Sequence, residues 1–395
     1  MNGHVIPYTP FAVDFWRSRQ CDRTGTRLFF LTHMHADHTS GLSPSWKHPI
    51  YCSEVTAKLL KQKFDITPEL VRPLAVGESR ILPLDETRQE TMTVKVFDAN
   101  HCPGAVMFLF QGYFGSIFYT GDFRYSSEMF GHDVLAKRQS IDVLYLDNTY
   151  CSPECEFPSR TQATQMIKDI ISRHPGHDIV LGVSSNALGK EDMLVELAKT
   201  FQTWVVVTPQ RLETLKLLEL PNVFTTDPEA GRIRVALKYQ ITRKNIDRWN
   251  KEKPTIAIIA SSMYAGLDGI PNVHIVPYSD HSSHRELHEF VSRLKPRSII
   301  PVVRAGNGKG ESGASLQRRA DMHCFDNYLD SSAKRKFQVP ESVEKFMYHG
   351  SNSATGRIKG TSIFDGPKRV RSKLGVHYID DDSTEHSTSE NRKCT

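Results

Sequence analysis

Six residues, His33-Met34-His35-Ala36-Asp37-His38, place four groups that can bind a metal ion within one short stretch. They come almost directly after Leu28-Phe29-Phe30-Leu31, an apolar run that is typical of a short buried strand. Imidazole nitrogens and carboxylate oxygens are good ligands for Zn²⁺ and similar ions. Such a density of ligands is hard to explain by core packing, although a solvated polar loop is the alternative interpretation.

The spacing within this stretch predicts two ions rather than one. Side chains two positions apart on an extended segment point to the same side, so His33 and His35 can approach one ion. Asp37 and His38 lie past the expected bend and can face a second ion. The stretch therefore predicts the centre of a metal site at the end of a strand.

Further candidate ligands recur at the ends of other apolar runs. His101 follows the run 92–97, Asp122 follows 116–119, Asp147 follows 142–146, and His281 lies between the run 273–276 and a helix that opens at Ser283. A lone histidine in a turn is more often structural than a ligand. Repetition at the ends of successive strands favours the metal interpretation, because functional residues gather on loops that a rigid scaffold positions.

Composition limits the classes of protein to consider. Hydrophobic residues make up 39% of the 395 residues and charged residues 24%, which fits a soluble globular chain, and no apolar run is long enough to cross a bilayer. No secretory signal is visible, and seven scattered cysteines favour a reducing compartment over a disulfide framework. After residue 303 there are 16 Lys and Arg against 12 Asp and Glu, so most of the net charge of +5 lies there. This excess permits nucleic-acid binding without demonstrating it.

The chain divides into four parts by its pattern of apolar, polar and turn-forming residues. Residues 1–150 alternate apolar runs with Gly and Asp turns, which indicates layered sheets. From 151 to 270, strands and helices alternate at the spacing of a small parallel sheet. Residues 271–303 return to strand, helix and strand, and 304–395 are rich in Gly, Ser and charge, which predicts a largely disordered tail.

Taken together, these motifs resemble the metallo-β-lactamase superfamily. The resemblance rests on His33 to His38, His101, Gly121-Asp122 and His281, with Asp14 similar to the superfamily's early aspartate. Asp147, His281 and Val303 resemble the added motifs of the β-CASP branch, which processes nucleic acids, and within it the chain looks most like the DNA-crosslink-repair nucleases. The implied fold is α/β: a four-layer αββα metallo-β-lactamase sandwich with an inserted β-CASP α/β domain and a disordered C-terminal tail.

The resemblance also implies roles for the site residues. One ion is held by His33, His35 and His101, the other by Asp37, His38 and His281, and Asp122 bridges them. Asp14 and Asp147 orient histidines or handle protons, which makes Asp14, Asp37, Asp122, Asp147 and His281 the candidate catalytic residues. Two divalent ions, zinc in the first place and otherwise Mn, Mg or Fe, would activate water and polarise a phosphodiester.

A candidate phosphate pocket lies at the turn between a strand and a helix. Ser184, Ser185, Gly189 and Lys190 stand there, and helix-start amides together with a lysine can hold a phosphate. An ordinary strand-to-helix turn is an equally good interpretation. The resemblance favours the pocket, because the crosslink-repair relatives use this region for the substrate's 5′ phosphate.

The leading functional prediction is a 5′-to-3′ DNA exonuclease acting at 5′-phosphorylated ends, in telomere end processing and interstrand crosslink repair. The resemblance implies a nuclear, telomeric monomer without membrane contact, whose partners are DNA, a telomere-binding shelterin protein and crosslink-repair factors. The alternatives are an RNA-processing enzyme or small-molecule hydrolase on the same fold, and a non-catalytic DNA-repair scaffold. Val303 favours DNA, because the RNA-processing members have a histidine there.

Overall fold

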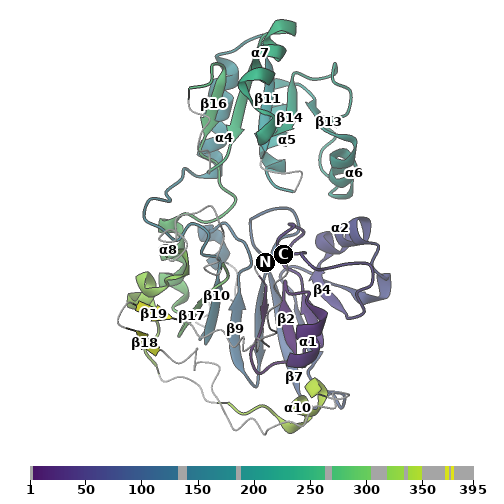
Figure 1. Ribbon diagram of the computed structural model, residues 1–395, viewed down its shortest axis with the longest axis vertical. Coiled ribbons are helices and arrows are strands. Elements are labelled where there is room, and N and C mark those ends of the chain that lie inside the picture. The colour runs from purple at the N-terminus through teal and green to yellow at the C-terminus, as the bar shows by residue number, and fades with distance from the viewer. Residues whose placement is uncertain are drawn as a thin grey trace, which may run out of the picture.

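The computed structural model describes residues 3–131, 140–183, 188–262, 269–303, 318–332 and 337–348, together with the backbone of 370–372 and 375–377. Two bodies lie one above the other along the long axis of the molecule (Figure 1). The lower body contains two sheets and the upper body a third. In the described part of the chain, no helix is both long enough and apolar enough to cross a membrane.

The first sheet of the lower body has five strands in the order β1-β2-β3-β4-β5. They are β1 (His4–Val5), β2 (Phe11–Val13), β3 (Leu28–Phe30), β4 (Ile50–Ser53) and β5 (Val71–Leu74). β2 to β5 pair in parallel, while β1 is antiparallel to β2. Helices α1 (Ser18–Thr24) and α2 (Glu54–Phe64) belong to this half, and a 3₁₀ turn, η1 (Pro68–Leu70), precedes β5.

The second sheet has six strands in the order β17-β10-β9-β8-β7-β6. They are β6 (Ser79–Pro83), β7 (Thr91–Asp98), β8 (Val106–Gly112), β9 (Gly115–Tyr119), β10 (Val143–Leu146) and β17 (Ile299–Pro301). β6 to β9 form an antiparallel meander, whereas β9, β10 and β17 are parallel. The sheet thus joins a strand from beyond residue 298 to strands from the first third of the chain.

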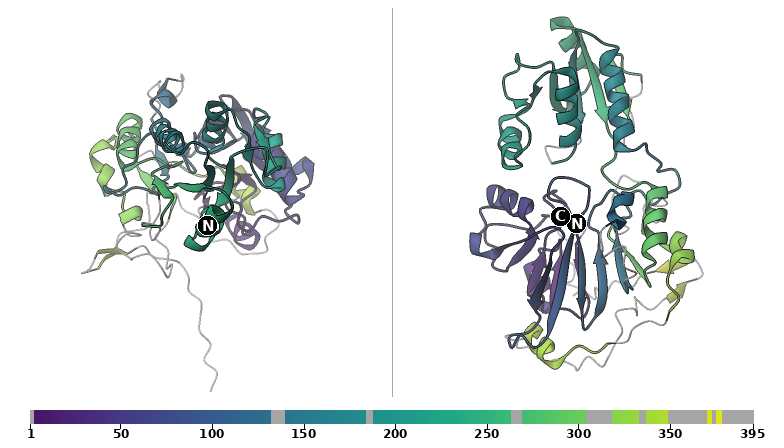
Figure 2. Two further views of the ribbon diagram at one scale, coloured as in Figure 1. Left: turned by 90° about the horizontal axis from the view of Figure 1, so that it is seen from above. Right: turned by 180° about the vertical axis from the view of Figure 1, so that it is seen from behind.

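Apolar side chains fill the space between these two sheets and cover their outer faces. Phe11 and Phe30 of the first sheet pack against Phe108 and Phe110 of the second. Helix α8 (His284–Leu294) buries Phe290 against the other face of the second sheet, and α2 covers the other face of the first. This arrangement confirms the expected αββα sandwich (Figure 2).

The third sheet is entirely parallel, in the order β13-β12-β14-β11-β15-β16. Its strands are β11 (Asp178–Val183), β12 (Val205–Val206), β13 (Phe224–Thr225), β14 (Ile233–Leu237), β15 (Thr255–Ala260) and β16 (Val273–Val276). Its helices are α4 (Arg160–Ser172), α5 (Glu191–Phe201), α6 (Pro209–Leu217) and α7 (Arg243–Glu252). Because β16 pairs with β15, the boundary expected at residue 270 falls inside this unit, and the chain leaves it only after Val276.

Two stretches of the expected tail are folded parts of the lower body. The 3₁₀ helix η4 (His323–Tyr328) buries Phe325 beside α8, and helix α10 (Glu341–Tyr348) buries Val343 between the two sheets. Strands β18 (Val370–Ser372) and β19 (Gly375–His377) form a separate antiparallel pair. The order signal after Arg304 is weak because these stretches are short and separated by polar sequence. Two further 3₁₀ turns, η2 (Ser127–Phe130) and η3 (Lys238–Gln240), complete the described elements.

Candidate metal centre

Four aspartate and histidine side chains come from the ends of strands that finish at one edge of the sandwich. Asp14 directly follows β2 and His33 follows β3, which is parallel to β2. Asp122 follows β9 and Asp147 follows β10, which is parallel to β9. Residues far apart in the sequence therefore meet at this edge, as the recurrence at strand ends predicts.

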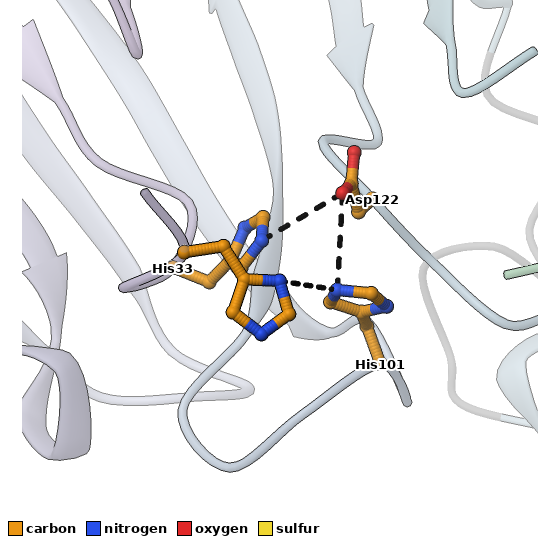
Figure 3. A group of neighbouring side chains, drawn as sticks. His33, His101 and Asp122 are labelled. Carbon is orange, nitrogen blue, oxygen red and sulfur yellow. Dashed lines mark hydrogen bonds and ion pairs between the residues drawn. The ribbon is translucent and has the colours of Figure 1, made fainter. Parts of the chain in front are cut away.

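One group of side chains surrounds the carboxylate of Asp122 (Figure 3). His33 Nε2 lies 3.7 Å from Asp122 Oδ2, and His101 Nε2 lies 3.8 Å from the same oxygen. His35 completes the group, with its Nδ1 3.1 Å from His101 Nε2. These are the residues expected to hold the first ion, with Asp122 added.

A second group, Asp37 and His38, faces the other oxygen of Asp122. His38 Nε2 lies 3.2 Å from Asp122 Oδ1 and 3.5 Å from Asp37 Oδ2. His281 Nε2 is 3.9 Å from Asp122 Oδ2, on the side of Asp147. Asp122 thus touches both groups, as a bridging ligand must. The assignment of His281 to the second ion together with Asp37 and His38 stays a prediction.

The spacing of these atoms suits metal ions better than direct hydrogen bonds. Two ligand atoms about 2.0–2.1 Å from one tetrahedral ion are about 3.3 Å apart. The gaps to Asp122 from the rings of His33 and His101 are too long for hydrogen bonds and close to that separation. His33 Nε2 is buried and has no hydrogen-bond partner among the described residues, which is costly unless an ion meets it. The donor set therefore fits two divalent ions.

Each of the five histidines is held by an oxygen acceptor on its other ring nitrogen. Two of these acceptors are carboxylates: His38 Nδ1 faces Asp14 Oδ2 (2.7 Å), and His281 Nδ1 faces Asp147 Oδ2 (2.8 Å). Two are backbone carbonyls: His101 Nδ1 faces that of Asp280 (2.9 Å), and His35 Nε2 faces that of Leu188 (2.7 Å). His33 Nδ1 faces the hydroxyl oxygen of Thr32 (2.9 Å). A carboxylate or carbonyl can only accept, and the Thr32 hydroxyl gives its hydrogen to Asp14, so in each case the proton sits on the nitrogen that faces the oxygen. The lone pair of the opposite nitrogen then points into the site, as a metal ligand requires.

Asp14 and Thr32 are buried residues whose side chains contact the histidines of this cluster. Asp14 is fully buried and adopts a left-handed φ of 53°, which turns its carboxylate back toward the chain after β3. Thr32 donates its backbone N–H to Asp14 Oδ1 (2.8 Å) and its hydroxyl to Asp14 Oδ2 (2.7 Å). The same hydroxyl oxygen lies next to His33. Asp14 Oδ2 thus faces His38 Nδ1, and Asp147 Oδ2 faces His281 Nδ1, which is the arrangement that an orienting role needs; the role itself stays a prediction.

Charges and burial act on the histidines in opposite directions. Burial lowers the pKa of His101 to about 3 and that of His33 well below its usual range, and neighbouring histidines add to the effect. Both rings are therefore neutral and able to bind a metal. Burial also opposes protonation of His38 and His281, but the Asp122 carboxylate with Asp14 or Asp147 outweighs it, and the pKa of His281 rises to about 9.

The phosphate pocket expected at the strand-to-helix turn is only partly described. Ser184 and Ser185 lie outside the described residues. The Gly189 amide donates to Glu191 Oε2 (2.7 Å), and Lys190 Nζ lies 2.7 Å from Asp280 Oδ2. A phosphate at this place would have to share Lys190 with that carboxylate, and the pocket stays a prediction.

Three groups that contact the candidate ligands were not predicted from the sequence motifs: the Thr32 hydroxyl and the carbonyls of Leu188 and Asp280. Thr32 could be found, since it is a polar residue at the end of the apolar run before His33. The carbonyls of Leu188 and Asp280 could not, because a backbone acceptor carries no signal in the residue type. Among the described residues, Cys151 and Cys155 are free thiols.

Comparison with known proteins settles the family of this site. Residues 17–178 match the profile of the beta-lactamase superfamily domain, and residues 218–307 match that of the DNA repair metallo-beta-lactamase. A Danio rerio protein named 5′ exonuclease Apollo is 49% identical over 404 residues, which cover 99% of this chain and 67% of the relative. The chain belongs to the DNA repair metallo-β-lactamase family.

Other members of the DNA repair metallo-β-lactamase family are also similar. The Mus musculus protein of the same name is 46% identical, over 98% of this chain and 69% of the relative. The Homo sapiens DNA cross-link repair 1A protein is 34% identical, over 78% of this chain and 31% of the relative. The chain thus spans about two thirds of the length of the Apollo proteins.

Proposed function

We propose that this protein is a metal-dependent nuclease that hydrolyses phosphodiester bonds of DNA from the 5′ end. The observation that carries the proposal is the arrangement of five histidines. Each histidine has one ring nitrogen bound to an oxygen acceptor. In four of them the second ring nitrogen lies within 4 Å of an Asp122 oxygen. The second ring nitrogen of His35 faces His101 instead. Relatives named 5′ exonuclease, which match almost the whole chain, supply the reaction and its polarity.

The residues of the site divide the chemical work between them. Two divalent ions bound there supply Lewis acidity, which lowers the pKa of a coordinated water and offsets charge on the phosphate in the transition state. Asp122 presents Oδ2 to His33 and His101 and Oδ1 to His38, so its carboxylate would hold an ion on each side. Asp14 and Asp147 hold the proton of His38 and His281 on Nδ1, so that Nε2 of each ring faces Asp122. Asp37, half exposed, is the ligand that opens toward solvent and substrate.

A 5′ phosphate is the substrate feature that the site would recognise. Lys190 and the segment before α5 lie next to the metal ligands, since Lys190 binds Asp280 and the Asp280 carbonyl binds His101. Helix-start amides and a lysine offer the charge and the donors that a terminal phosphate needs. Ser184 and Ser185 precede them in the chain and stay candidate phosphate-binding residues, which lie outside the described part of the structure.

Val303 supports DNA rather than RNA as the substrate. Val303 donates its backbone N–H to Asn148 Oδ1 (2.8 Å) and accepts from Asn148 Nδ2 (3.0 Å), directly after Asp147 in the chain. Its apolar side chain offers no ligand at this place. An RNA nuclease or a small-molecule hydrolase is the second candidate on the same fold, and a scaffold without activity is the third.

The deciding assay uses oligonucleotides labelled at the 3′ end that differ only in a 5′ phosphate or a 5′ hydroxyl, as DNA and as RNA. We expect stepwise shortening of the phosphorylated DNA, abolished by EDTA and by Asp37→Ala. Asp247→Ala, on the exposed surface of α7, is the matched control and should cleave normally. Cleavage by Asp37→Ala at the normal rate would contradict the proposed site.

Zinc is the first metal to test, followed by Mn, Mg and Fe, since histidine and carboxylate ligands suit several of these ions. We further propose that the protein acts in the nucleus, in crosslink repair and at telomeres, as a monomer with a shelterin protein and repair factors as partners. The family supports the nuclear setting through relatives named for DNA cross-link repair. Imaging of the tagged protein against a telomeric marker tests the finer placement.

A further inference from the structure

The segment 188–190 of the upper body lies against the metal centre of the lower body. The Leu188 carbonyl lies 2.7 Å from His35 Nε2. Lys190 Nζ lies 2.7 Å from Asp280 Oδ2, and the carbonyl of Asp280 holds His101 Nδ1 at 2.9 Å. Both histidines belong to the group expected to hold the first ion. The orientation of two ligands therefore depends on a segment of the inserted unit.

Leu188 is anchored to the lower body through its side chain as well. That side chain packs against the apolar cluster that contains Met34, Trp46 and Leu59. The carbonyl and the side chain of one residue thus both face the lower body, although the residue lies between β11 and α5 of the upper one. Any displacement of this segment would move the acceptor that His35 uses.

A buried ion pair, Glu191–Arg211, hydrogen-bonds to the backbone of the segment 188–190. Glu191 accepts the Gly189 amide (2.7 Å), and Arg211 Nη2 donates to the Gly189 carbonyl (3.3 Å) and to Glu191 Oε1 (3.0 Å). Glu191 is 2% exposed and Arg211 7%, so both charges are removed from water. Such a pair adds little net stability, because desolvation offsets the attraction between the charges. Its geometric effect, the clamping of both backbone groups of Gly189, is more specific.

We propose that the Glu191–Arg211 pair is a positioning device through which the inserted unit sets the geometry of the first metal position. The pair fixes Gly189, Gly189 places the Leu188 carbonyl, and that carbonyl keeps the proton of His35 on Nε2. His35 Nδ1 then offers its lone pair to the ion. The proposal rests on the two-ion centre of the proposed function, and it concerns metal binding rather than cleavage.

The coupling acts in both directions. If the placed segment strengthens binding of the first ion, the bound ion strengthens placement of the segment by the same factor. Zinc should therefore slow hydrogen exchange at the Gly189 amide of the native protein. In a variant without the ion pair, zinc should slow that exchange much less.

The test measures zinc affinity directly, by titration of the metal-free protein against a chromophoric chelator. We expect Arg211→Met combined with Glu191→Gln to lower the affinity for one of the two zinc ions by about 10–100-fold and to leave the affinity for the other unchanged. A loss of this size is usual when a metal ligand loses its outer hydrogen-bond partner. The double substitution leaves no lone charge in the interior. Arg211→Lys, which keeps the charge but lacks the fork of donors, should give a smaller loss at the same ion.

Lys58→Met is the matched control. It breaks an ion pair that joins the two bodies, Lys58 Nζ to Glu219 Oε1 at 2.7 Å, whereas Glu191 and Arg211 both lie in the upper body. The Lys58 pair is exposed and far less costly to lose. Native zinc affinity in this control, with the loss confined to one ion in the Arg211 variants, supports the proposal. Native affinity for both ions in folded Arg211 variants overturns it, as does an equal loss of both ions. A native protein that binds two zinc ions but cuts no DNA would contradict the proposed function and leave this inference intact.

Discussion

Replacement of Asp14 by asparagine tests the central part of the metal site. Asp14 is fully buried and accepts three hydrogen bonds, from the Thr32 amide (2.8 Å), the Thr32 hydroxyl (2.7 Å) and His38 Nδ1 (2.7 Å). An asparagine of the same shape can keep its oxygen toward the Thr32 amide. Its NH₂ group then faces the hydroxyl and the imidazole, where the native carboxylate oxygen accepts both.

The magnitude follows from the two bonds that asparagine cannot make. Hydrogen bonds to a charged acceptor contribute about 1.5–3 kcal/mol each to stability, so the loss of both would cost about 3–6 kcal/mol. To meet the NH₂ group, the imidazole of His38 must carry its proton on Nε2, where the metal should bind. We expect part of the loss in thermal stability and part in zinc affinity, the latter about 10–100-fold.

Asp142→Asn is the control for a buried carboxylate far from the ligands. Asp142 is 2% exposed and binds the Ser116 amide (2.8 Å) and Arg297 Nη1 (2.6 Å) at the opposite end of β9 and β10. The control should unfold at a lower temperature and bind zinc normally. Two zinc ions of native affinity in Asp14→Asn would refute the account of how His38 is oriented.

Three further predictions follow from the same geometry. Gly121→Ala should lower both the melting temperature and zinc affinity, measured by calorimetry and titration, because φ is +54° and a Cβ would lie 2.8 Å from the Thr32 side chain. Zinc affinity should rise between pH 6.5 and 9, since the metal competes with the proton on His281, whose pKa is about 9 because Asp147 and Asp122 outweigh burial. In the metal-free protein this group stabilises the fold fully below pH 6.5 and less as the pH rises through 9, so denaturant titrations there should show a fall, and a flat profile would contradict the assignment. Phe325→Ala should cost about 3–5 kcal/mol in urea unfolding, because this residue of η4 is fully buried beside α8; a loss below about 1 kcal/mol would show that η4 contributes little to the core.

Local patterns predicted most of the regular structure correctly. The apolar runs at 92–97, 116–119 and 142–146 are β7, β9 and β10, and the helix expected to open at Ser283 is α8. These elements bury continuous or alternating apolar faces, so their periodicity is written in the residues themselves. Elements η4 and α10 were missed, because six and eight residues with one or two buried side chains carry almost no periodic signal.

The sequence by itself determined which residues can bind metal and where along the strands they stand. Side-chain chemistry and strand ends are local properties, so the residue types and their spacing were enough to name His33, His101, Asp122 and His281. Only the tertiary structure decided how they meet: one carboxylate between two groups of histidines, and four of the five imidazoles held by an acceptor from another segment. The Leu188 carbonyl is the clearest case, because a backbone oxygen 153 positions away from His35 becomes its partner only when two sheets and an inserted unit pack together.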